Sequence, residues 1–250
     1  MSENHKKIWI TGASSGIGKA VAEKFAKEGW KVAVSARRKE LLDELAKNEN
    51  ISSFPLDVTD RSQINNTFKN ILNEFGELDI CLFSSGTYEP KDEQSIDPDK
   101  IKNVINVNFL GVIDCVKVVE DYFKNKTSGH ISIVSSIAGY RGLPNSSGYG
   151  PSKAALTNFS ESIYFDFKKY GVRVSIISPG FIKTPLTDKN DFPMPFLKTP
   201  EYAAEKIFNG LVKGNAFEIH FPKGLTLTLK FLRILPYKLY LFLVDKLVKR

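Results

Sequence analysis

Tyr149 and Lys153 are the two residues whose types and spacing point most directly to chemistry. They belong to the run Tyr-Gly-Pro-Ser-Lys, which opens a segment of helical periodicity, and Pro151 fits the first turn of a helix because its missing N–H would have no partner there. Residues four apart share a helix face, so the phenol and the ammonium converge. A tyrosine with an ordinary pKa of about 10 is a weak acid at neutral pH, but a nearby cation lowers that pKa. The pair predicts proton transfer at a substrate oxygen, although a Tyr-x-x-x-Lys run alone is common.

Two polar residues upstream extend this pair into a candidate site. Ser136 ends the run Ile-Val-Ser-Ser at the carboxyl end of a predicted central strand, which is where open α/β sheets bind ligands. Its hydroxyl is suited to hold a substrate carbonyl beside the tyrosine, and the alternative is that it only caps the following turn. Asn108 lies in a long helical stretch, where asparagine has poor propensity. It is therefore expected to hold a water molecule or a backbone kink.

A glycine-rich turn follows the first predicted strand, with the sequence Thr-Gly-Ala-Ser-Ser-Gly-Ile-Gly at residues 11–18. Glycines there let the backbone turn tightly and approach a pyrophosphate, while the N-terminus of the next helix faces the anion. An ordinary tight turn is the alternative, but the position after the first strand of a βαβ unit favours a dinucleotide site. The expected cofactor ligands in this turn are Gly12, Ser14, Ser15, Gly16, Ile17 and Gly18.

The residues after the second predicted strand bear on the choice of cofactor. An acidic side chain there would pair with the ribose 2′-hydroxyl of NAD, whereas this chain has Arg37 and Arg38. Guanidinium groups suit a doubly charged 2′-phosphate, so the sequence predicts NADP (NADPH); a solvated surface pair is the alternative. Asp57, at the end of the third predicted strand, is expected to accept the adenine amino group or else to cap a helix.

Strands and helices alternate along the chain. Runs that are apolar on both faces and are joined by helical crossovers indicate a parallel sheet covered on both sides, which is an α/β, Rossmann-like doubly wound fold. In the segment after the first strand, Ile17, Val21, Phe25 and Ala26 share one helix face, and Gly29 is the expected C-cap. The predicted strands are Ile8–Thr11, Val32–Ala36, Phe54–Val58, Ile80–Ser84, Ile131–Ser135, Val174–Ser178 and Phe217–Phe221.

A length of 250 residues is enough for one α/β core and short for two. We expect a single domain over residues 1–222, with an apolar, proline-rich flap near residues 187–200, followed by a C-terminal tail over residues 223–250.

At these residues the sequence resembles the short-chain dehydrogenase/reductase family over about residues 6–222. Five signals occur in the family's order: the T-G-x-x-x-G-I-G turn, Asn108, Ser136, Tyr149 with Lys153, and Pro179-Gly180 after the sixth strand. The resemblance implies a general acid/base role for Tyr149, with Lys153 as pKa modulator and ligand of the nicotinamide ribose. It implies that Ser136 orients the substrate and that Asn108 holds a proton-relay water.

The resemblance also extends to the cofactor ligands and the assembly. The stretch Pro179-Gly180-Phe-Ile-Lys-Thr matches the part of the family that contacts the nicotinamide carboxamide, through Ile182 and Thr184. Family members commonly form dimers or tetramers, so a homo-oligomer is implied. One departure is Phe83-Ser84-Ser85-Gly86 where the family usually has N-N-A-G; it keeps Gly86, another expected cofactor ligand, but puts the hydrogen bonds near the adenosine in doubt.

The charge of the chain is concentrated in its tail. The net charge is +7, and residues 223–250 contain seven basic residues and one acidic residue, so the body is nearly neutral. This distribution favours a membrane surface or a partner over DNA. The apolar residues after Leu225 are interrupted by Lys230, Arg233, Lys238 and Asp245, so no stretch reaches the roughly 18 apolar residues of a spanning helix.

Past Pro236 the tail is predicted to form an amphipathic helix. Lys238, Asp245 and Lys249 share one stripe, Phe242 is out of register, and the other side carries Leu241, Leu243, Val244, Leu247 and Val248. This side is expected to pack on the protein's own body, on another subunit or on an anionic bilayer. The polar N-terminal residues 1–7 lack a secretory signal, so we expect a cytoplasmic protein, with reduced, structural thiols at Cys81 and Cys115 and no metal site.

Together these patterns predict an NADPH-dependent oxidoreductase that transfers hydride to a carbonyl or from the corresponding alcohol. The apolar flap and tail favour a hydrophobic substrate such as a lipid or a steroid-like ketone. Two alternatives stay open: a dinucleotide-binding regulatory protein without turnover, and an epimerase or dehydratase on the same scaffold.

Overall fold

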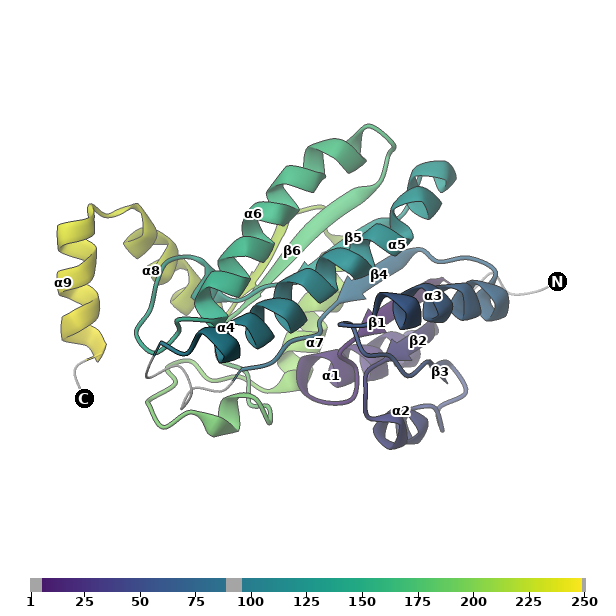
Figure 1. Ribbon diagram of the computed structural model, residues 1–250, viewed down its shortest axis with the longest axis horizontal. Coiled ribbons are helices and arrows are strands. Elements are labelled where there is room, and N and C mark those ends of the chain that lie inside the picture. Colours follow the sequence, from purple (N-terminus) through teal and green to yellow (C-terminus); the bar gives the residue numbers. More distant parts are fainter. Residues whose placement is uncertain (1–5, 89–95, 249–250) are drawn as a thin grey trace.

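Seven parallel strands form one sheet in the order β3-β2-β1-β4-β5-β6-β7 (Figure 1). In this computed structural model residues 6–88 and 96–248 are described, the last two by their backbone alone. The strands are β1 (Lys7–Thr11), β2 (Lys31–Ser35), β3 (Ile51–Ser53), β4 (Ile80–Phe83), β5 (His130–Val134), β6 (Arg173–Pro179) and β7 (Glu218–Phe221). The predicted doubly wound parallel sheet is therefore confirmed.

The third strand differs from the prediction, which placed it at Phe54–Val58. The strand lies at Ile51–Ser53, and the following residues run beside β2 without regular pairing. The Phe54 N–H donates to the Val34 carbonyl at 2.9 Å and the Leu56 N–H to the Ala36 carbonyl at 3.0 Å. Pro55 stands between them, and it is tolerated because β3 is the edge strand of the sheet and the missing N–H faces away from β2.

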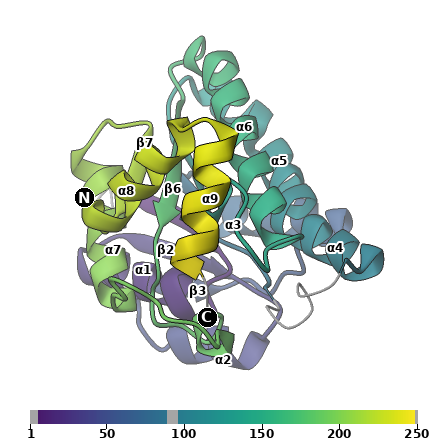
Figure 2. The same cartoon turned by 90° about the vertical axis from the view of Figure 1, so that its left-hand side faces the viewer.

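Helices cover both faces of the sheet (Figures 1 and 2). Alternate residues of β1 point to opposite faces: Ile8 and Ile10 pack with α1, α2 and α7, whereas Trp9 packs with α3, α5 and α6. These helices are α1 (Gly16–Lys27), α2 (Lys39–Leu45), α3 (Arg61–Phe75), α5 (Gly111–Lys126), α6 (Tyr149–Lys168) and α7 (Pro200–Phe208). As predicted, α1 is followed by Gly29 in a left-handed conformation, with φ of 79°.

Several shorter elements complete the body. Helix α4 (Pro98–Ile105) runs through the π-helical turn η2 (Asn106–Leu110) into α5. The others are the single turns η3 (Ile137–Gly139) and η4 (Thr187–Lys189) and the π-helical turn η5 (Asn209–Lys213). The predicted flap, residues 187–200, begins with η4, and a bridge from Ile182 to Lys198 ties it to the body.

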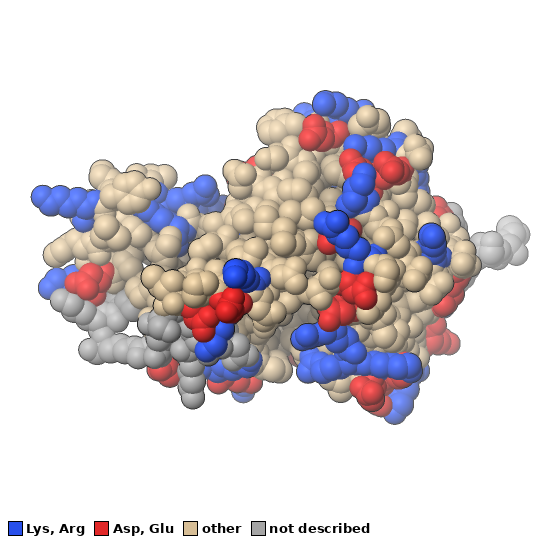
Figure 3. Space-filling view, in the orientation of Figure 1, with Lys and Arg blue, Asp and Glu red and all other residues tan. Residues whose placement is uncertain are grey.

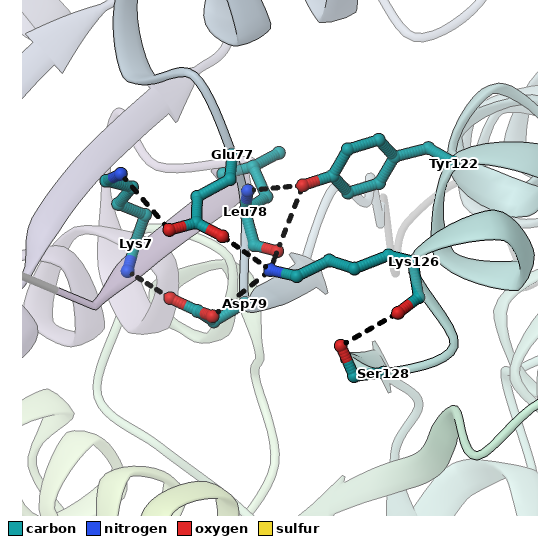
Figure 4. Close-up of polar contacts among 7 residues, drawn as sticks. All are labelled: Lys7, Glu77, Leu78, Asp79, Tyr122, Lys126 and Ser128. Atoms are coloured by element: carbon teal, nitrogen blue, oxygen red, sulfur yellow. Dashed lines mark hydrogen bonds and ion pairs between the residues drawn. The ribbon is translucent and has the colours of Figure 1, made fainter. Parts of the chain in front are cut away.

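The amino ends and the carboxyl ends of the strands differ in their surroundings. At the amino ends of β1 and β4, a network of ion pairs and hydrogen bonds fastens the strands together (Figure 4). The Lys126 ammonium donates to the Leu78 carbonyl at 2.7 Å and pairs with Asp79 at 3.3 Å, while the Lys7 N–H donates to Asp79 at 2.8 Å. The strand order reverses between β1 and β4, so at the opposite, carboxyl edge their connections diverge and leave a crevice.

The C-terminal segment forms two helices, α8 (Lys223–Ile234) and α9 (Tyr237–Val248), which lie beyond β7 at one end of the molecule (Figure 1). The predicted amphipathic pattern of α9 is confirmed only in part. Tyr240 and Val244 pack on Leu232 of α8, but Leu241 and Phe242 are exposed. The side chains of Leu247, Val248 and Lys249 lie outside the described residues. No helix in the described part of the chain combines the length and the apolar character needed to cross a membrane.

Candidate active site

The glycine-rich turn connects β1 to α1 at the carboxyl edge of the sheet. Gly12 has φ of 68°, and a side chain there would place its Cβ 2.7 Å from the Ser84 carbonyl oxygen. A Cβ on Gly18 would lie 2.4 Å from the Gly12 carbonyl oxygen. Only glycine lets the turn pack this closely against both β4 and its own helix. The N-terminus of α1, with its unpaired amide groups, therefore borders an open space.

That space is a cavity of about 500 Å³, which is within the range of cofactor sites. The predicted residues from seven separate stretches of chain meet around it. Its lining includes Gly12, Ser14, Ser15, Gly16, Ile17, Gly18, Arg37, Arg38, Asp57, Gly86, Ser136, Tyr149, Lys153, Pro179, Gly180, Ile182 and Thr184. Asn108 is the one predicted site residue outside this lining.

Arg38 lies over the glycine-rich turn. Its guanidinium donates to the Ser14 hydroxyl at 2.8 Å and to the Ser15 hydroxyl at 2.8 Å, which holds the side chain at the mouth of the cavity. Arg37 also lines the cavity. Asp57 is held nearby, because its carboxylate accepts hydrogen bonds from the N–H and the hydroxyl of Thr59. The carboxylate that caps α3 belongs to Asp60, so Asp57 orders the preceding turn instead.

Tyr149 and Lys153 lie in the first turns of α6, as predicted. The Lys153 ammonium donates to the Val134 carbonyl at 2.9 Å and lies 5.7 Å from the centre of the Tyr149 ring. Lys153 is buried, and this burial lowers its pKa to about 8. Ser136 follows β5, and its hydroxyl accepts the Ala138 N–H at 3.2 Å, so it caps the turn while it lines the cavity.

Asn108 occupies the π-helical turn η2, where the helix departs from α-helical geometry. Its side-chain amide is buried and pairs with the backbone of Thr87, accepting from the N–H at 2.7 Å and donating to the carbonyl at 3.0 Å. It also donates to the Ser152 hydroxyl at 3.1 Å. Asn108 thus lies at a helix distortion and joins the loop after β4 to α6 between Tyr149 and Lys153.

Comparison with known proteins agrees with this geometry. The family model described as short chain dehydrogenase matches residues 6–193. The chain is 33% identical over 242 residues to an uncharacterized oxidoreductase of Myxococcus xanthus, with 95% of each chain covered. The chain belongs to the short-chain dehydrogenase family. It is therefore an NAD(P)-dependent oxidoreductase.

Two further relatives of this short-chain dehydrogenase carry more specific names. A 3-oxoacyl-[acyl-carrier-protein] reductase of Thermotoga maritima is 34% identical over 189 residues, which cover 74% of this chain and 77% of the relative. The solved structure of ElxO with NADP bound is 29% identical, with a TM-score of 0.76 and coverage of 86% of this chain and 97% of that one.

The residues present fit a nicotinamide dinucleotide. Gly12 and Gly18 leave the space in which a pyrophosphate would lie against the N-terminus of α1. At the departure from the family's N-N-A-G after β4, the Ser84 backbone N–H donates to the Thr11 hydroxyl at 3.2 Å. A Cβ on Gly86 would lie 3.6 Å from the Lys153 ammonium nitrogen, so the retained glycine keeps that part of the cavity open.

Some residues of the site were missed in the sequence. The Tyr88 ring lies 4.8 Å from the Tyr149 ring, centre to centre, and Ser152 receives the hydrogen bond of Asn108. Thr187 also lines the cavity, and its hydroxyl donates to the Ile182 carbonyl at 2.6 Å. No residue pattern marks Tyr88, because it stands in a loop whose path depends on tertiary contacts. Thr187 begins η4 and the predicted flap, but the sequence did not indicate its contact with Ile182.

Proposed function

We propose that this short-chain dehydrogenase reduces a hydrophobic carbonyl compound with NADPH, or oxidises the corresponding alcohol. The observation that carries the proposal is that Tyr149, Lys153 and Ser136 line the same cavity as the glycine-rich turn. NADPH would supply the hydride, held by Ser14, Ser15, Gly16, Ile17, Asp57 and Gly86 at its adenosine and phosphate side and by Pro179, Gly180, Ile182 and Thr184 at its nicotinamide side.

The protein's own residues would then transfer the proton to the substrate. Ser136 donates a hydrogen bond to the carbonyl oxygen and positions it beside the Tyr149 hydroxyl. As the oxygen gains negative charge, Tyr149 donates its proton, and the buried Lys153 ammonium stabilises the phenolate that remains. Asn108 holds the loop after β4 against α6, and we propose that it also holds a water that returns a proton to the site.

Arg37 and Arg38 support the preference for NADPH. A 2′-phosphate carries about two negative charges and suits the planar fork of a guanidinium, and Arg38 is already ordered by Ser14 and Ser15. The NADP bound in the ElxO structure is compatible with this preference.

The surroundings of Ser136 and Gly180 support a hydrophobic substrate. Ile137, Tyr140 and Leu225 form an apolar cluster against which Phe181 packs, and the Phe181 ring lies 6.0 Å from that of Phe192 in the flap. A carbonyl substrate that passes between these side chains would leave water for an apolar surface. The acyl substrate named in the Thermotoga maritima relative is compatible with such a surface.

We further propose that residues 1–222 form the catalytic domain, with residues 187–200 as its flap, and that residues 223–250 are an appended tail. A homodimer or homotetramer is proposed from the resemblance alone, and a cytoplasmic location stays a separate proposal.

The test is NADPH consumption, followed by absorbance, with a panel of carbonyl compounds from short aldehydes to long-chain and cyclic ketones. We expect turnover to rise toward the apolar members and to fall at least a hundredfold in Tyr149→Phe. Tyr170→Phe, on the exposed surface, is the control and should keep full activity. Bound NADPH without turnover would favour the regulatory alternative, and product without net NADPH consumption would favour an epimerase or dehydratase.

A second measurement addresses the cofactor. Replacing Arg37 and Arg38 together by Asp should lower the kcat/KM ratio of NADPH to NADH at least tenfold. Lys69→Asp, on the exposed face of α3, removes a similar charge away from the cavity and should leave the ratio unchanged. An unchanged ratio in the double variant would contradict the assignment of these arginines.

A further inference from the structure

Helix α8 carries apolar stripes on two opposite sides. The inner stripe packs on the body of the protein and on α9, whereas the outer stripe faces away from them. Each stripe has members spaced by four and then three residues, which places them on one helix face. The inner stripe is Leu225, Leu229 and Leu232; the outer stripe is Leu227, Phe231 and Ile234, with exposed fractions of 55%, 60% and 76%.

Helix α9 extends this apolar surface. Tyr237, Leu241 and Phe242 are all more than half exposed, and Leu239 is exposed as well. Among the described residues, half of the exposed large hydrophobic side chains belong to these two helices. Isolated exposed apolar residues are ordinary on a soluble surface, but a contiguous set of this kind marks a contact with another apolar phase.

Basic side chains border the same two helices. Lys223, Arg233, Lys238 and Lys246 are exposed, and Asp245 is the one acidic residue between Lys223 and Lys246. Lys230 is different, because it is bound to Glu218 of β7. At the left end of the molecule in Figure 3, Lys and Arg in blue border uncharged residues in tan, with an acidic group in red below them.

We infer that the outer stripe of α8 and the exposed residues of α9 form a docking surface for an anionic lipid bilayer. Phe231, Ile234 and Phe242 would enter the boundary between headgroups and acyl chains, while Arg233 and Lys238 stay at the level of the acidic headgroups. Each cation near such a surface strengthens binding about fivefold.

Charge favours this occupant over a second copy of the chain. A twofold interface would place each basic helix pair against its own copy, and like charges would face one another. An anionic partner relieves this repulsion. A nucleic acid would supply the negative charge but would offer no apolar phase for Leu227, Phe231 and Ile234.

The docking surface borders the flap. A Cβ on Gly224 of α8 would lie 3.4 Å from the ring of Phe196, which is itself 58% exposed. Gly224 is adjacent on the helix to the outer stripe, so the apolar surface continues from α8 to the tip of the flap. A substrate dissolved in the bilayer would therefore meet the flap at the membrane surface. This last link depends on the proposed function, whereas docking itself does not.

The experiment is co-sedimentation of the full chain with vesicles of phosphatidylcholine alone and of phosphatidylcholine mixed with phosphatidylserine. We expect binding to the mixed vesicles at least tenfold stronger than to the neutral ones, and weaker at high salt. Replacing Phe231 and Ile234 together by Ser should lower the binding at least tenfold. Arg233→Glu with Lys238→Glu should do the same and should also weaken the salt dependence, to which Lys223 and Lys246 still contribute.

Matched variants make the outcome decisive. Phe165 of α6 is exposed to a similar degree as Phe231, at 66%, so Phe165→Ser controls for the loss of an exposed aromatic ring. Lys69→Glu controls for the reversal of a charge. Equal vesicle binding in the Phe231/Ile234 variant and in Phe165→Ser would overturn the proposal, provided that NADPH binding and thermal melting show both to be folded. The proposal would also be overturned if the parent protein failed to bind vesicles and formed a dimer that is lost in the Phe231/Ile234 variant. Sedimentation involves no turnover, so it can fail or succeed independently of the proposed reaction.

Discussion

Arg141 is the residue whose removal should most clearly release the C-terminal helices. It follows η3, and its guanidinium donates to the last carbonyls of α8 and its connection: Leu232 at 3.1 Å, Arg233 at 3.1 Å and Leu235 at 2.7 Å. The same group lies over the rings of Tyr237 and Tyr240, at 4.5 and 4.0 Å from their centres. One side chain thus caps α8 and holds the start of α9.

The expected cost of Arg141→Ala follows from these contacts. The three contacts share the two hydrogens of the Arg141 Nη1 atom, so they amount to two hydrogen bonds from a charged donor. These contribute about 1.5 kcal/mol each at a half-exposed site, and the contacts with the rings add about 1 kcal/mol. Water solvates part of the freed carbonyls, so the net loss is about 3 kcal/mol. Because about 1.4 kcal/mol corresponds to a factor of ten, α9 should open at least a hundred times more often.

Native-state hydrogen exchange measures this opening directly. The amides of Tyr240 and Val244 should lose about a hundredfold in protection in Arg141→Ala, while those of β4 stay unchanged. Arg141→Lys keeps the positive charge but loses the planar guanidinium, so it should retain only a minor part of the protection that Arg141→Ala loses. Arg61→Ala removes an arginine that pairs with Asp114 instead and serves as the control. Protection of α9 within threefold of the parent protein in Arg141→Ala would refute this account of the contact.

Three further predictions concern the site and its support. Gly18→Ala should raise the Kd for NADPH at least tenfold in titration calorimetry, because the new Cβ would lie 2.4 Å from the Gly12 carbonyl oxygen, whereas Gly142→Ala meets open space and should have no effect. Burial lowers the pKa of Lys153 to about 8, so the free protein loses this ammonium as the pH rises through 8. The affinity for the anionic cofactor should fall over that pH interval, and this dependence of affinity on pH should disappear in Lys153→Met. The same pH dependence in Lys153→Met would exclude Lys153 as its source. Burial raises the pKa of Glu218, but hydrogen bonds from a lysine and a tyrosine outweigh it and leave the pKa lowered. Its contribution to the free energy of unfolding is therefore present at neutral pH and lost as the pH falls through this lowered pKa. In thermal melts across the acid range, the part of the fall in stability that Glu218 causes should be absent from Glu218→Gln.

The sheet and the cavity were predictable because their signals are local. Buried parallel strands show as continuous apolar runs, and the glycines of residues 12–18 are required by backbone contacts that no other residue permits. The helical spacing of Tyr149 and Lys153 likewise fixes their common face. The third strand was misplaced for the converse reason: Ser52 and Ser53 lack the apolar character of a strand, while the apolar residues that follow surround a proline.

Other parts of the site depend on long-range contacts. The approach of Tyr88 to Tyr149 joins a loop to a helix some sixty residues later, and sequence periodicity carries no information about such a pair. The role of Asn108 was anticipated only as a water or a kink, because its partner Thr87 is a backbone group and leaves no mark on the sequence. In the tail, periodicity identified α9 as the amphipathic helix, whereas the clearer apolar stripes belong to α8.

The two stripes of α8 have a consequence for how the helix is oriented about its own axis. Either stripe could pack against the apolar surface of the body, so hydrophobicity alone does not fix the rotation of the helix about its axis. Polar residues on a third side do. Thr226 is fully buried and its hydroxyl is hydrogen-bonded to the His220 ring of β7 at 2.7 Å, and one turn later Lys230 pairs with Glu218 of β7. The leucines of the inner stripe supply the hydrophobic contact with the body. The Thr226 hydroxyl and the Lys230 ammonium determine the rotation of the helix, and therefore which apolar stripe faces inward and which remains exposed.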